Sequence, residues 1–401
     1  MKRGTDLYKA HNNSPSIDLA EILAESLGIN YERATKLLES KSTRTLRYKN
    51  IRYIALRRDL GNHYEGTAIL IDEKTGEYRV VEGYPHIKRV LLLSKAVPQH
   101  FVDWVIVEEK MDGHNVRVIK FKDGIYAVTR GGYICPYTTA RMRHEHGKSL
   151  ENLIDAIGEE AVVAGEVVGL ENPYTRYYYP EAPEWGFFVF DIFRKGLDPL
   201  SVEDRRRLVE EYGLRNVPLL GKYHKDDWQG ILEVVSNLEE VGREGVVMKD
   251  PYYRVDPLKY TTSYINTKDI QEGMKYPFDE GHSFIYPRVL RQMFKAIEDD
   301  WDEEKLAKEA QRLGEAILVT AVESVKRFLR GMPIAEEFML TFYNMRDFED
   351  FVSHITLLGV PITIVSIDQA SESYIKVKIL KHKKTPEYYK RILRTGLSPL
   401  D

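Results

Sequence analysis

The sequence predicts an α+β fold, with a strand-rich centre between a small N-terminal module and a helical C-terminal region. Between residues 98 and 260, short runs of β-branched and aromatic residues recur, with few helical segments between them. After Pro277 the apolar residues take helical spacing, and a βαββα pattern closes the chain. Strands that follow one another with helices inserted are typical of antiparallel sheets in an α+β domain.

Composition narrows the class of protein. With 401 residues, 43% hydrophobic and 30% charged, the chain is globular and long enough for two or three domains. A net charge of -4 excludes a global basic field, so a nucleic-acid partner needs locally grouped cations. The single cysteine, Cys135, excludes an intramolecular disulfide. No signal peptide and no membrane span are recognisable, so we expect a cytoplasmic protein without a membrane partner.

An N-terminal module is expected over residues 1–97. It has two helices, the first with Ser16 as N-cap and Gly28 as its stop, and the second starting at Asn30. Strands follow, two of them joined by a hairpin at 74–76. The expected elements are helices over 17–28 and 30–38 and strands over 66–71, 77–82 and 87–93.

The strand-rich domain is expected over residues 98–262. Its β candidates are 102–109, 116–121, 125–129, 162–168, 187–192 and 245–249. Its expected helices are 150–157, 202–212 and 228–238.

Two further parts are expected after this domain, a helical part over 263–332 and an α+β module over 333–401. The helical part has helices over 287–298 and 303–330, the second with apolar residues at a spacing close to 3.5. That spacing fits either pairing with its twin in a second subunit or packing within the same chain. In the last module we expect strands over 338–343, 362–367 and 374–380 and helices over 347–358 and 386–393.

A candidate nucleophile lies where the first strand of the central domain ends. Residues 105–118 read VIVEEKMDGHNVRV, an apolar run that meets a short charged turn and then a second β-like run. Strand alternation places Glu108 and Lys110 on one face, which makes Glu108 a candidate acceptor beside the amine. The plain alternative for Lys110 is a solvated lysine at a strand end.

Four other stretches carry charge into apolar settings. Glu166 lies inside 163–168, Asp191 follows Phe190 inside 187–192, and lysines occupy positions 249 and 259. Taken singly, each is a strand-end charge facing water. Buried charges are rare unless they are paired, so five such stretches together indicate that the charges meet.

The residue types fit chemistry at a nucleotide phosphate. A lysine attacks only when neutral, and nearby cations such as Lys249 and Lys259 lower its pKa and neutralise phosphate oxygens. Phe190 is suited to stack on a base and Glu166 to accept ribose hydroxyls. Arg130, beside two glycines, is suited to clamp a sugar or phosphate, and the alternative is an ordinary turn. The sequence has no Walker-type phosphate loop.

The order of these stretches resembles the covalent nucleotidyltransferase superfamily of ATP-dependent ligases and mRNA capping enzymes. The sequence Lys110-Met-Asp-Gly resembles motif I, Gly-Glu166 motif III and Phe190-Asp motif IIIa. The run from Glu244 to Lys249 resembles motif IV, and Lys259 resembles motif V. The resemblance covers residues 95–260 and implies a nucleotidyltransferase domain in which Lys110 is adenylated.

Two features point within the superfamily to RNA ligases. Asn115 stands five residues after the lysine, where DNA ligases usually have Arg and RNA ligases often have Asn. Helices and a βαββα module follow motif V, where DNA ligases and capping enzymes have an OB-fold. This arrangement resembles the archaeal homodimeric ATP-dependent RNA ligases. It implies ATP and Mg²⁺ as cofactors, a homodimer, and RNA with 5′-phosphate and 3′-hydroxyl ends as substrate.

The resemblance assigns roles to individual residues. The catalytic candidates are Lys110, Lys249 and Lys259, and the nucleotide-binding candidates are Glu108, Asn115, Arg117, Arg130, Glu166, Phe190 and Glu244. No metal ligand is assigned, although Glu166 and Glu244 offer oxygen atoms. One departure concerns motif V, because Thr261 stands where DNA ligases often have a second lysine. Lys268 or Mg²⁺ are the candidates to replace that charge.

Three alternatives stay open: a DNA ligase, a capping-type nucleotidyltransferase, and a non-catalytic RNA-binding protein on a ligase scaffold. The RNA-binding surface is also open. Residues 141–144 and 174–179 mix cations with aromatic residues, as single-strand binding prefers. Polar loops with locally packed tyrosines explain the same residues.

Overall fold

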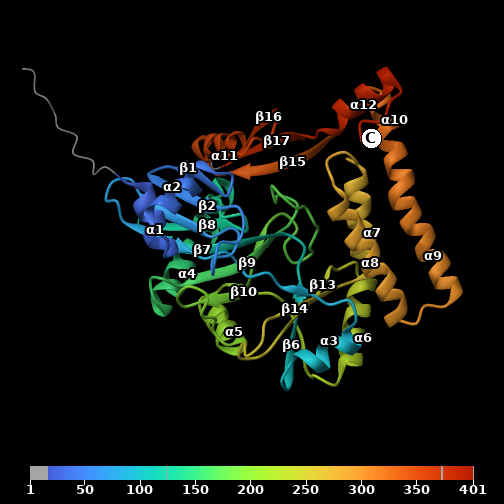
Figure 1. Ribbon diagram of the computed structural model, residues 1–401, viewed down its shortest axis with the longest axis horizontal. Helices are drawn as coiled ribbons and strands as arrows, with labels where there is room; N and C mark the ends of the chain where they lie inside the picture. Colours follow the sequence, from blue (N-terminus) through green and yellow to red (C-terminus); the bar gives the residue numbers. More distant parts are fainter. Residues whose placement is uncertain (1–16, 123, 372–373, 401) are drawn as a thin grey trace, which may run out of the picture. The chain divides into compact units, whose positions relative to one another are not determined.

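The computed structural model describes residues 17–122, 124–371 and 374–400 (Figure 1). These residues form two compact units. Of the described residues, the smaller unit takes in 17–84, 121–122 and 128–134, and the larger unit takes in the others. The four-part division expected above stays a prediction. Within the described ranges, no helix is long and apolar enough to cross a membrane.

The smaller unit packs two helices on a four-stranded antiparallel sheet of order β1-β2-β3-β4. Its elements are α1 (Leu19–Leu27), α2 (Tyr31–Glu39), β1 (Thr43–Tyr48), β2 (Ile51–Leu56), β3 (Ala68–Asp72) and β4 (Tyr78–Val81). Asp18 caps α1 by accepting from the Ala20 N–H at 2.9 Å, and Gly28, with φ of 62°, ends it. The expected cap, Ser16, lies outside the described residues. Strands β1 and β2 were not predicted.

The larger unit is built on two five-stranded sheets. The first, called here the β9 sheet, has the order β11-β10-β9-β7-β8. The second, the β6 sheet, has the order β12-β6-β13-β14-β5. The strands are β5 (Lys88–Arg89), β6 (Trp104–Lys110), β7 (His114–Phe121), β8 (Gly124–Thr129), β9 (Val162–Val168), β10 (Gly186–Phe193), β11 (Arg215–Asn216), β12 (Leu219–His224), β13 (Gly245–Lys249) and β14 (Leu258–Thr261). All six strands predicted for the central domain are present.

One face of the β9 sheet is apolar and carries the main core. Val116, Val118 and Val163 pack there with helices α4 (Pro136–Ile157) and α5 (Val202–Glu211). The C-terminal module contributes to the same core through Phe338 and Phe351. This module therefore stabilises the central domain directly rather than folding around a core of its own.

One face of the β6 sheet is apolar in the same way. Val105, Val107 and Met248 pack against helices α3 (Leu93–His100) and α6 (Trp228–Glu240). The strand predicted over 87–93 is wrong in length, because only Lys88–Arg89 forms a strand, and helix α3 was not predicted. The residues between Leu92 and Phe101 form a helix, because their apolar side chains can then reach this core.

Helices follow the two sheets, as predicted. They are α7 (Ser263–Met274), α8 (His282–Glu298), α9 (Glu303–Gly314), the π-helical turn η1 (Glu315–Val319) and α10 (Thr320–Leu329). The single helix expected over 303–330 is continuous but contains this π-helical turn. Helix α7 was not predicted. The Thr262 side chain caps it by accepting from the Ile265 N–H at 3.3 Å.

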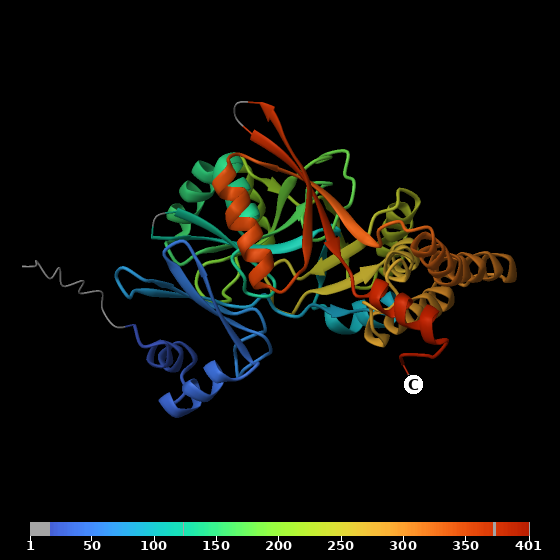
Figure 2. The same ribbon diagram turned by 90° about the horizontal axis from the view of Figure 1, so that it is seen from above.

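The closing βαββα pattern is confirmed. It comprises β15 (Ala335–Phe342), α11 (Met345–Leu357), β16 (Ile362–Ser371), β17 (Tyr374–His382) and α12 (Thr385–Thr395). The sheet order is β15-β17-β16, and both pairings are antiparallel. Helix α11 lies beside α4 (Figure 2), which joins the module to the main core.

Candidate active site

The β6 sheet has one apolar face and one charged face. Val105 and Val107 belong to the apolar core, so Glu108 and Lys110 project from the opposite face, as alternation predicted. Strand register adds neighbours to that face. Glu108 lies opposite Val247, which lies opposite Lys259, and Lys110 lies opposite Gly245. The lysines of motifs I and V therefore share one surface of one sheet.

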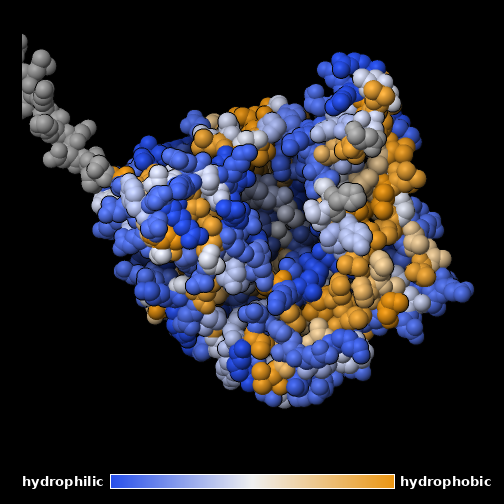
Figure 3. Space-filling model, viewed as in Figure 1, coloured by the Kyte–Doolittle hydropathy of each residue, from blue (hydrophilic) through white to orange (hydrophobic). Residues whose placement is uncertain are grey.

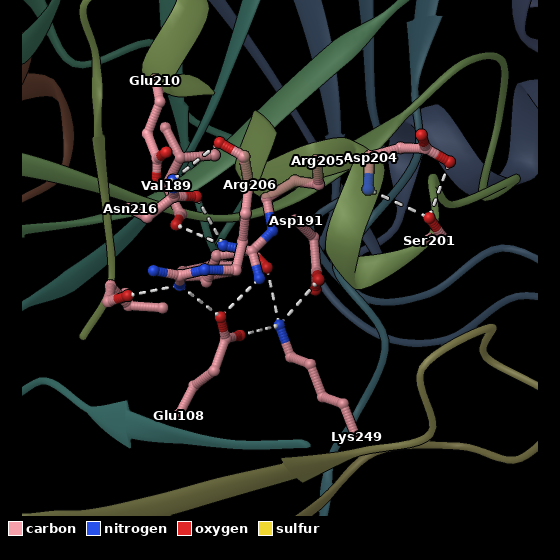
Figure 4. Close-up of polar contacts among 12 residues, drawn as sticks. Glu108, Val189, Asp191, Ser201, Asp204, Arg205, Arg206, Glu210, Asn216 and Lys249 are labelled. Carbon is pink, nitrogen blue, oxygen red and sulfur yellow. Dashed lines mark hydrogen bonds and ion pairs between the residues drawn. The ribbon is translucent and has the colours of Figure 1, made fainter. Parts of the chain in front are cut away.

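The β9 sheet also has a polar face. Because Val116 and Val118 lie in its core, Asn115 and Arg117 project from the other side, and Glu166 lies directly opposite Asn115. The polar faces of the two sheets meet, since the Lys249 ammonium of β13 donates to the Asp191 carboxylate of β10 at 2.8 Å (Figure 4). Five stretches far apart in sequence thus supply charges to one region.

Lys110 is surrounded by carboxylates. Its Nζ lies 2.5 Å from Oε1 of Glu244, and its side chain is only 24% exposed. Burial alone lowers the pKa of Lys110, but the negative charges of Glu244, Glu166 and Asp112 outweigh burial and raise it above its ordinary value. The expectation that neighbouring lysines lower this pKa is therefore wrong for the protein without nucleotide.

The surrounding acids respond to the same crowding. Burial, with repulsion from Glu244 and Asp112, raises the pKa of Glu166 to about 8 despite the attraction of Lys110. Burial and the nearby carboxylates of Glu244 and Asp269 raise the pKa of Asp112 to about 7. Burial and mutual repulsion thus raise the pKa of both carboxyl groups toward neutral pH, and a positively charged ligand would favour their ionised forms.

Two glycines allow the strands to approach at this point. A Cβ on Gly113 would collide with the carbonyl group of Val167. Gly245, opposite Lys110, has φ of +148°, and a Cβ there would collide with the carbonyl oxygen of Tyr260. The glycines of motifs I and IV are therefore required by close backbone contact.

Asn115 presents an unused polar atom. Its side-chain oxygen is buried, and among the described residues no donor reaches it. A buried oxygen without a donor is costly unless something supplies one. A ligand with N–H or O–H groups, such as a nucleoside, fits that requirement.

Glu108 and Lys249 form a buried network that the sequence did not predict in this form. Lys249 Nζ lies 3.1 Å from Oε2 of Glu108 and 2.6 Å from the carbonyl oxygen of Phe190. Arg205 and Arg206 of α5 bind the other oxygen of Glu108 at 2.5 and 3.0 Å (Figure 4). Glu108 is thus held by three cations rather than by Lys110. The consecutive arginines 205–207 were visible in the sequence, but helix spacing alone does not show which of them turn inward.

The other predicted residues lie in different places. Lys259 is on the charged face, and Phe190 is half-buried with the Lys249 ammonium 5.8 Å from the centre of its ring. Arg117 is 1% exposed. Arg130 belongs to the smaller unit, so its part in the site stays a prediction.

Two cavities share lining residues, and one of them reaches Asp112 in the turn that follows Lys110. One, of about 960 Å³, is lined by Asp112, residues of 170–176, helices α7 and α10, and β15. The other, of about 610 Å³, is lined by Arg176, Tyr177, Tyr178, Pro180, Val241, Arg243, Tyr264 and Lys268. Arg176 and Lys268 line both. The second cavity is called here the tyrosine groove.

The donor set gives a partial fit to a metal ion. In the described part of the chain, no group of three or more His, Cys, Asp or Glu side chains is arranged to hold one. Mg²⁺ commonly uses one or two carboxylates together with substrate phosphates and water. Glu166 and Glu244 satisfy that smaller requirement, so the site suits a metal that arrives with a phosphate ligand.

Comparison with known proteins matches most of the chain. An RNA ligase family model matches residues 103–261, and a model described as the ligase Pab1020 C-terminal region matches 273–396. An uncharacterised protein of Methanocaldococcus jannaschii is 34% identical over 363 residues, covering 89% of this chain and 90% of that protein.

Solved structures agree. One described as an archaeal ATP-dependent RNA ligase has a TM-score of 0.85 and 34% identity, covering 94% of this chain and 99% of that one. Another, described as a putative ATP-dependent DNA ligase from Aquifex aeolicus, has a TM-score of 0.81 and 27% identity, covering 92% and 100%. The chain therefore belongs to the archaeal ATP-dependent RNA ligase family, a family of ATP-dependent polynucleotide ligases.

Proposed function

We propose that this protein joins or circularises RNA with 5′-phosphate and 3′-hydroxyl ends through an AMP group carried on Lys110. The observation that carries this proposal is the setting of the Lys110 amine. It ends β6 on a polar face, 2.5 Å from Glu244, with the unsatisfied oxygen of Asn115 on the facing polar surface.

Lys110 needs to lose a proton before it can attack. Glu244 is in contact with the ammonium and is placed to receive that proton. In the first step a bond forms between Nζ and the α-phosphorus of ATP while the bond to pyrophosphate breaks. The AMP group then passes to the RNA 5′-phosphate, and attack by the 3′-hydroxyl releases AMP. Each step is an in-line displacement, so positioning and cations provide most of the catalysis.

The polar faces supply the nucleotide contacts. We assign Asn115 and Glu166 to the nucleoside, Phe190 to the base, and Arg117, Arg130 and Lys259 to sugar or phosphate oxygens. Lys249 positions Glu108 through their ion pair. A direct contact of Lys249 with the reacting phosphate stays a prediction. Mg²⁺, held by Glu166 or Glu244 with phosphate and water, would neutralise charge at phosphorus.

The tyrosine groove is the proposed RNA path. Its lining combines three cations with three tyrosines and no carboxylate. The Lys268 ammonium lies 3.6 Å from the centre of the Tyr177 ring, and Tyr178 is 56% exposed. Exposed rings beside cations are the arrangement that binds single-stranded nucleic acid. Arg141, from the other stretch considered, is buried and paired with Glu171 at 2.9 Å, so that stretch does not fit as an RNA surface.

Helices α8 to α10 form the proposed dimer surface. Apolar side chains gather along them (Figure 3) and are exposed in the single chain. They are Tyr286, Met293, Ile297, Leu306, Leu318, Val319, Val322 and Leu329. Soluble proteins seldom leave such a patch uncovered, so we infer that a second copy covers it. Within the helix expected over 303–330, Ile317 and Val325 are partly buried while Leu306 is 52% exposed.

A DNA ligase is the second candidate, favoured by the Aquifex structure at 27% identity. Comparing the sealing of matched RNA and DNA strands with 5′-phosphates decides between the two. Equal or faster sealing of DNA would reject the RNA assignment.

The lysine assignment is tested with α-labelled ATP and GTP. We expect ATP to label the wild-type protein, Lys110→Ala to abolish the label, and Lys222→Ala, an exposed lysine of the same sheet, to keep it. Labelling by GTP alone would indicate a capping-type enzyme, and failure of every nucleotide to label would favour a non-catalytic RNA-binding protein.

A further inference from the structure

Two arginines converge at the position where the second lysine of motif V is missing. Arg89 of β5 donates from Nη1 to the Thr261 hydroxyl at 3.1 Å. That hydroxyl lies 3.4 Å from the side-chain oxygen of Asn266, and Arg291 of α8 donates to the same oxygen at 3.4 Å. The two guanidinium groups therefore donate to two oxygen atoms that lie 3.4 Å apart, although one arginine comes from a strand and the other from a helix.

A third arginine flanks them. Arg288 lies one helical turn before Arg291 on α8, and residues three apart share a helix face. Three contacts fix the Arg288 guanidinium. Its Nε lies 2.7 Å from the Asp269 carboxylate, and its Nη1 donates to the Phe284 carbonyl oxygen at 2.7 Å. The guanidinium carbon also lies 3.6 Å from the centre of the Phe284 ring. We call Arg89, Arg288 and Arg291 the arginine cluster.

The cluster carries more positive charge than its surroundings balance. Burial and repulsion by Arg89 and Arg288 lower the pKa of Arg291 to about 10. Burial also lowers the pKa of Arg89, with repulsion by Arg288 and partial compensation by Glu244 and Asp269. Three half-buried guanidinium groups beside two carboxylates leave a local excess of charge, which an anion would relieve. Guanidinium groups are suited to phosphate because they bind two oxygens at once.

The cluster flanks the reacting amine. Thr261 lies opposite Gly245, and Gly245 lies opposite Lys110, so two strand spacings of about 4.8 Å separate the Thr261 backbone from that of Lys110. Glu244, which contacts Lys110, also attracts Arg89 and Arg291. A ligand whose reacting phosphorus is at Lys110 can therefore extend its remaining phosphates toward the arginines.

We propose that Arg89, Arg288 and Arg291 bind the β- and γ-phosphates of the nucleoside triphosphate and the pyrophosphate that leaves, replacing the missing lysine of motif V. This inference rests on the proposed function. A triphosphate tail fits better than an RNA strand, because a tail concentrates several charges in one place whereas RNA carries one charge per nucleotide. Lys268, which with Mg²⁺ was one of two candidates from the sequence, lies over the Tyr177 ring and lines the tyrosine groove.

The test separates the ATP-dependent step from sealing. Arg89→Gln and Arg291→Gln are compared with Arg194→Gln, a surface arginine of the same unit that is 49% exposed. We expect the two cluster variants to raise the KM for ATP in self-adenylylation by about tenfold to a hundredfold, as lost charged hydrogen bonds do. The pyrophosphate concentration needed to strip AMP from the adenylylated enzyme rises in parallel. Sealing of RNA supplied with a pre-adenylylated 5′ end stays at the wild-type rate, because that reaction uses no triphosphate.

Other outcomes overturn the assignment. If Arg89→Gln and Arg291→Gln fold and both keep the wild-type KM for ATP, the assignment is rejected. If they lose sealing at an unchanged KM for ATP, the arginine cluster binds an RNA phosphate instead. Arg89→Lys, which keeps the charge but loses the two-oxygen contact, should bind ATP more tightly than Arg89→Gln and less tightly than wild type, and its KM decides the matter if Arg89→Gln unfolds. Calorimetric binding of inorganic pyrophosphate to wild type and Arg291→Gln tests the anion site even if self-adenylylation fails. The failure of this inference is thus distinguishable from failure of the ligase assignment.

Discussion

Replacing Lys249 by Met tests the buried network between the two sheets. The ammonium lies 2.8 Å from Asp191, 3.1 Å from Glu108 and 2.6 Å from a carbonyl oxygen, and its side chain is 1% exposed. Met has a similar length but no charge. The variant therefore keeps the packing and leaves two buried carboxylates without the cation that bridges them.

Removing one partner of a buried ion pair costs about 3–5 kcal/mol, because the remaining charge stays buried. Arg205 and Arg206 still hold Glu108, so we expect the lower half of that range. With about 2.1 cal/mol/K of unfolding entropy per residue over 401 residues, a loss of about 4 kcal/mol lowers Tm by roughly 5 °C.

Urea denaturation and thermal unfolding of the full chain measure this loss. Lys222→Met is the matched control, since Lys222 is an exposed lysine of β12 in the same sheet, with its ammonium 5.1 Å from the Trp104 ring centre. It should change the free energy of unfolding by less than about 0.5 kcal/mol. Equal stability of Lys249→Met and wild type would refute the network as described. Low adenylylation by a fully stable Lys249→Met protein would instead support direct action at phosphorus.

Three further predictions follow from the site, the groove and the helices. The pKa of Glu166 is about 8 in the folded protein against 4.5 ordinarily, so its contribution to stability is full below pH 4.5 and is lost as pH rises through 8. Urea titrations of Glu166→Gln should therefore lose less stability between pH 5 and pH 9 than wild type, by up to a few kcal/mol, and identical pH profiles would contradict the assigned pKa. Tyr178→Ala should raise the KM for RNA by about tenfold, as loss of one stacked base does, and leave self-adenylylation with ATP unchanged; an unchanged RNA KM would remove this residue from the RNA path. Leu318→Glu, at a side chain 67% exposed in the single chain, should convert dimers to folded monomers in sedimentation, while Glu304→Gln on the same helical run should not; a persistent dimer would place the interface elsewhere.

Local patterns in the sequence determined most of the elements. Strand alternation over 105–110 placed Glu108 and Lys110 on one face, and the structure confirms it. The Asn30 and Gly28 signals located two helix ends, because capping depends on a few neighbouring residues. Periodicity missed α3 and α7, because the side chains that they bury are set by partners distant in sequence.

The partners of each charge were decided only by tertiary structure. Glu244 is 134 residues from Lys110, yet their contact raises the pKa of a lysine that was expected to have a lowered one. Lys249 was expected beside the nucleophile as a cation that lowers its pKa, but its position on β13 brings it to Glu108 and Asp191. Arg89 stands in a two-residue strand with no motif around it, and only the parallel pairing of β5 with β14 brings it to Thr261. Alternation fixes the face on which a side chain projects, whereas the ionisation and role of that side chain depend on charges that the fold brings from other strands and helices.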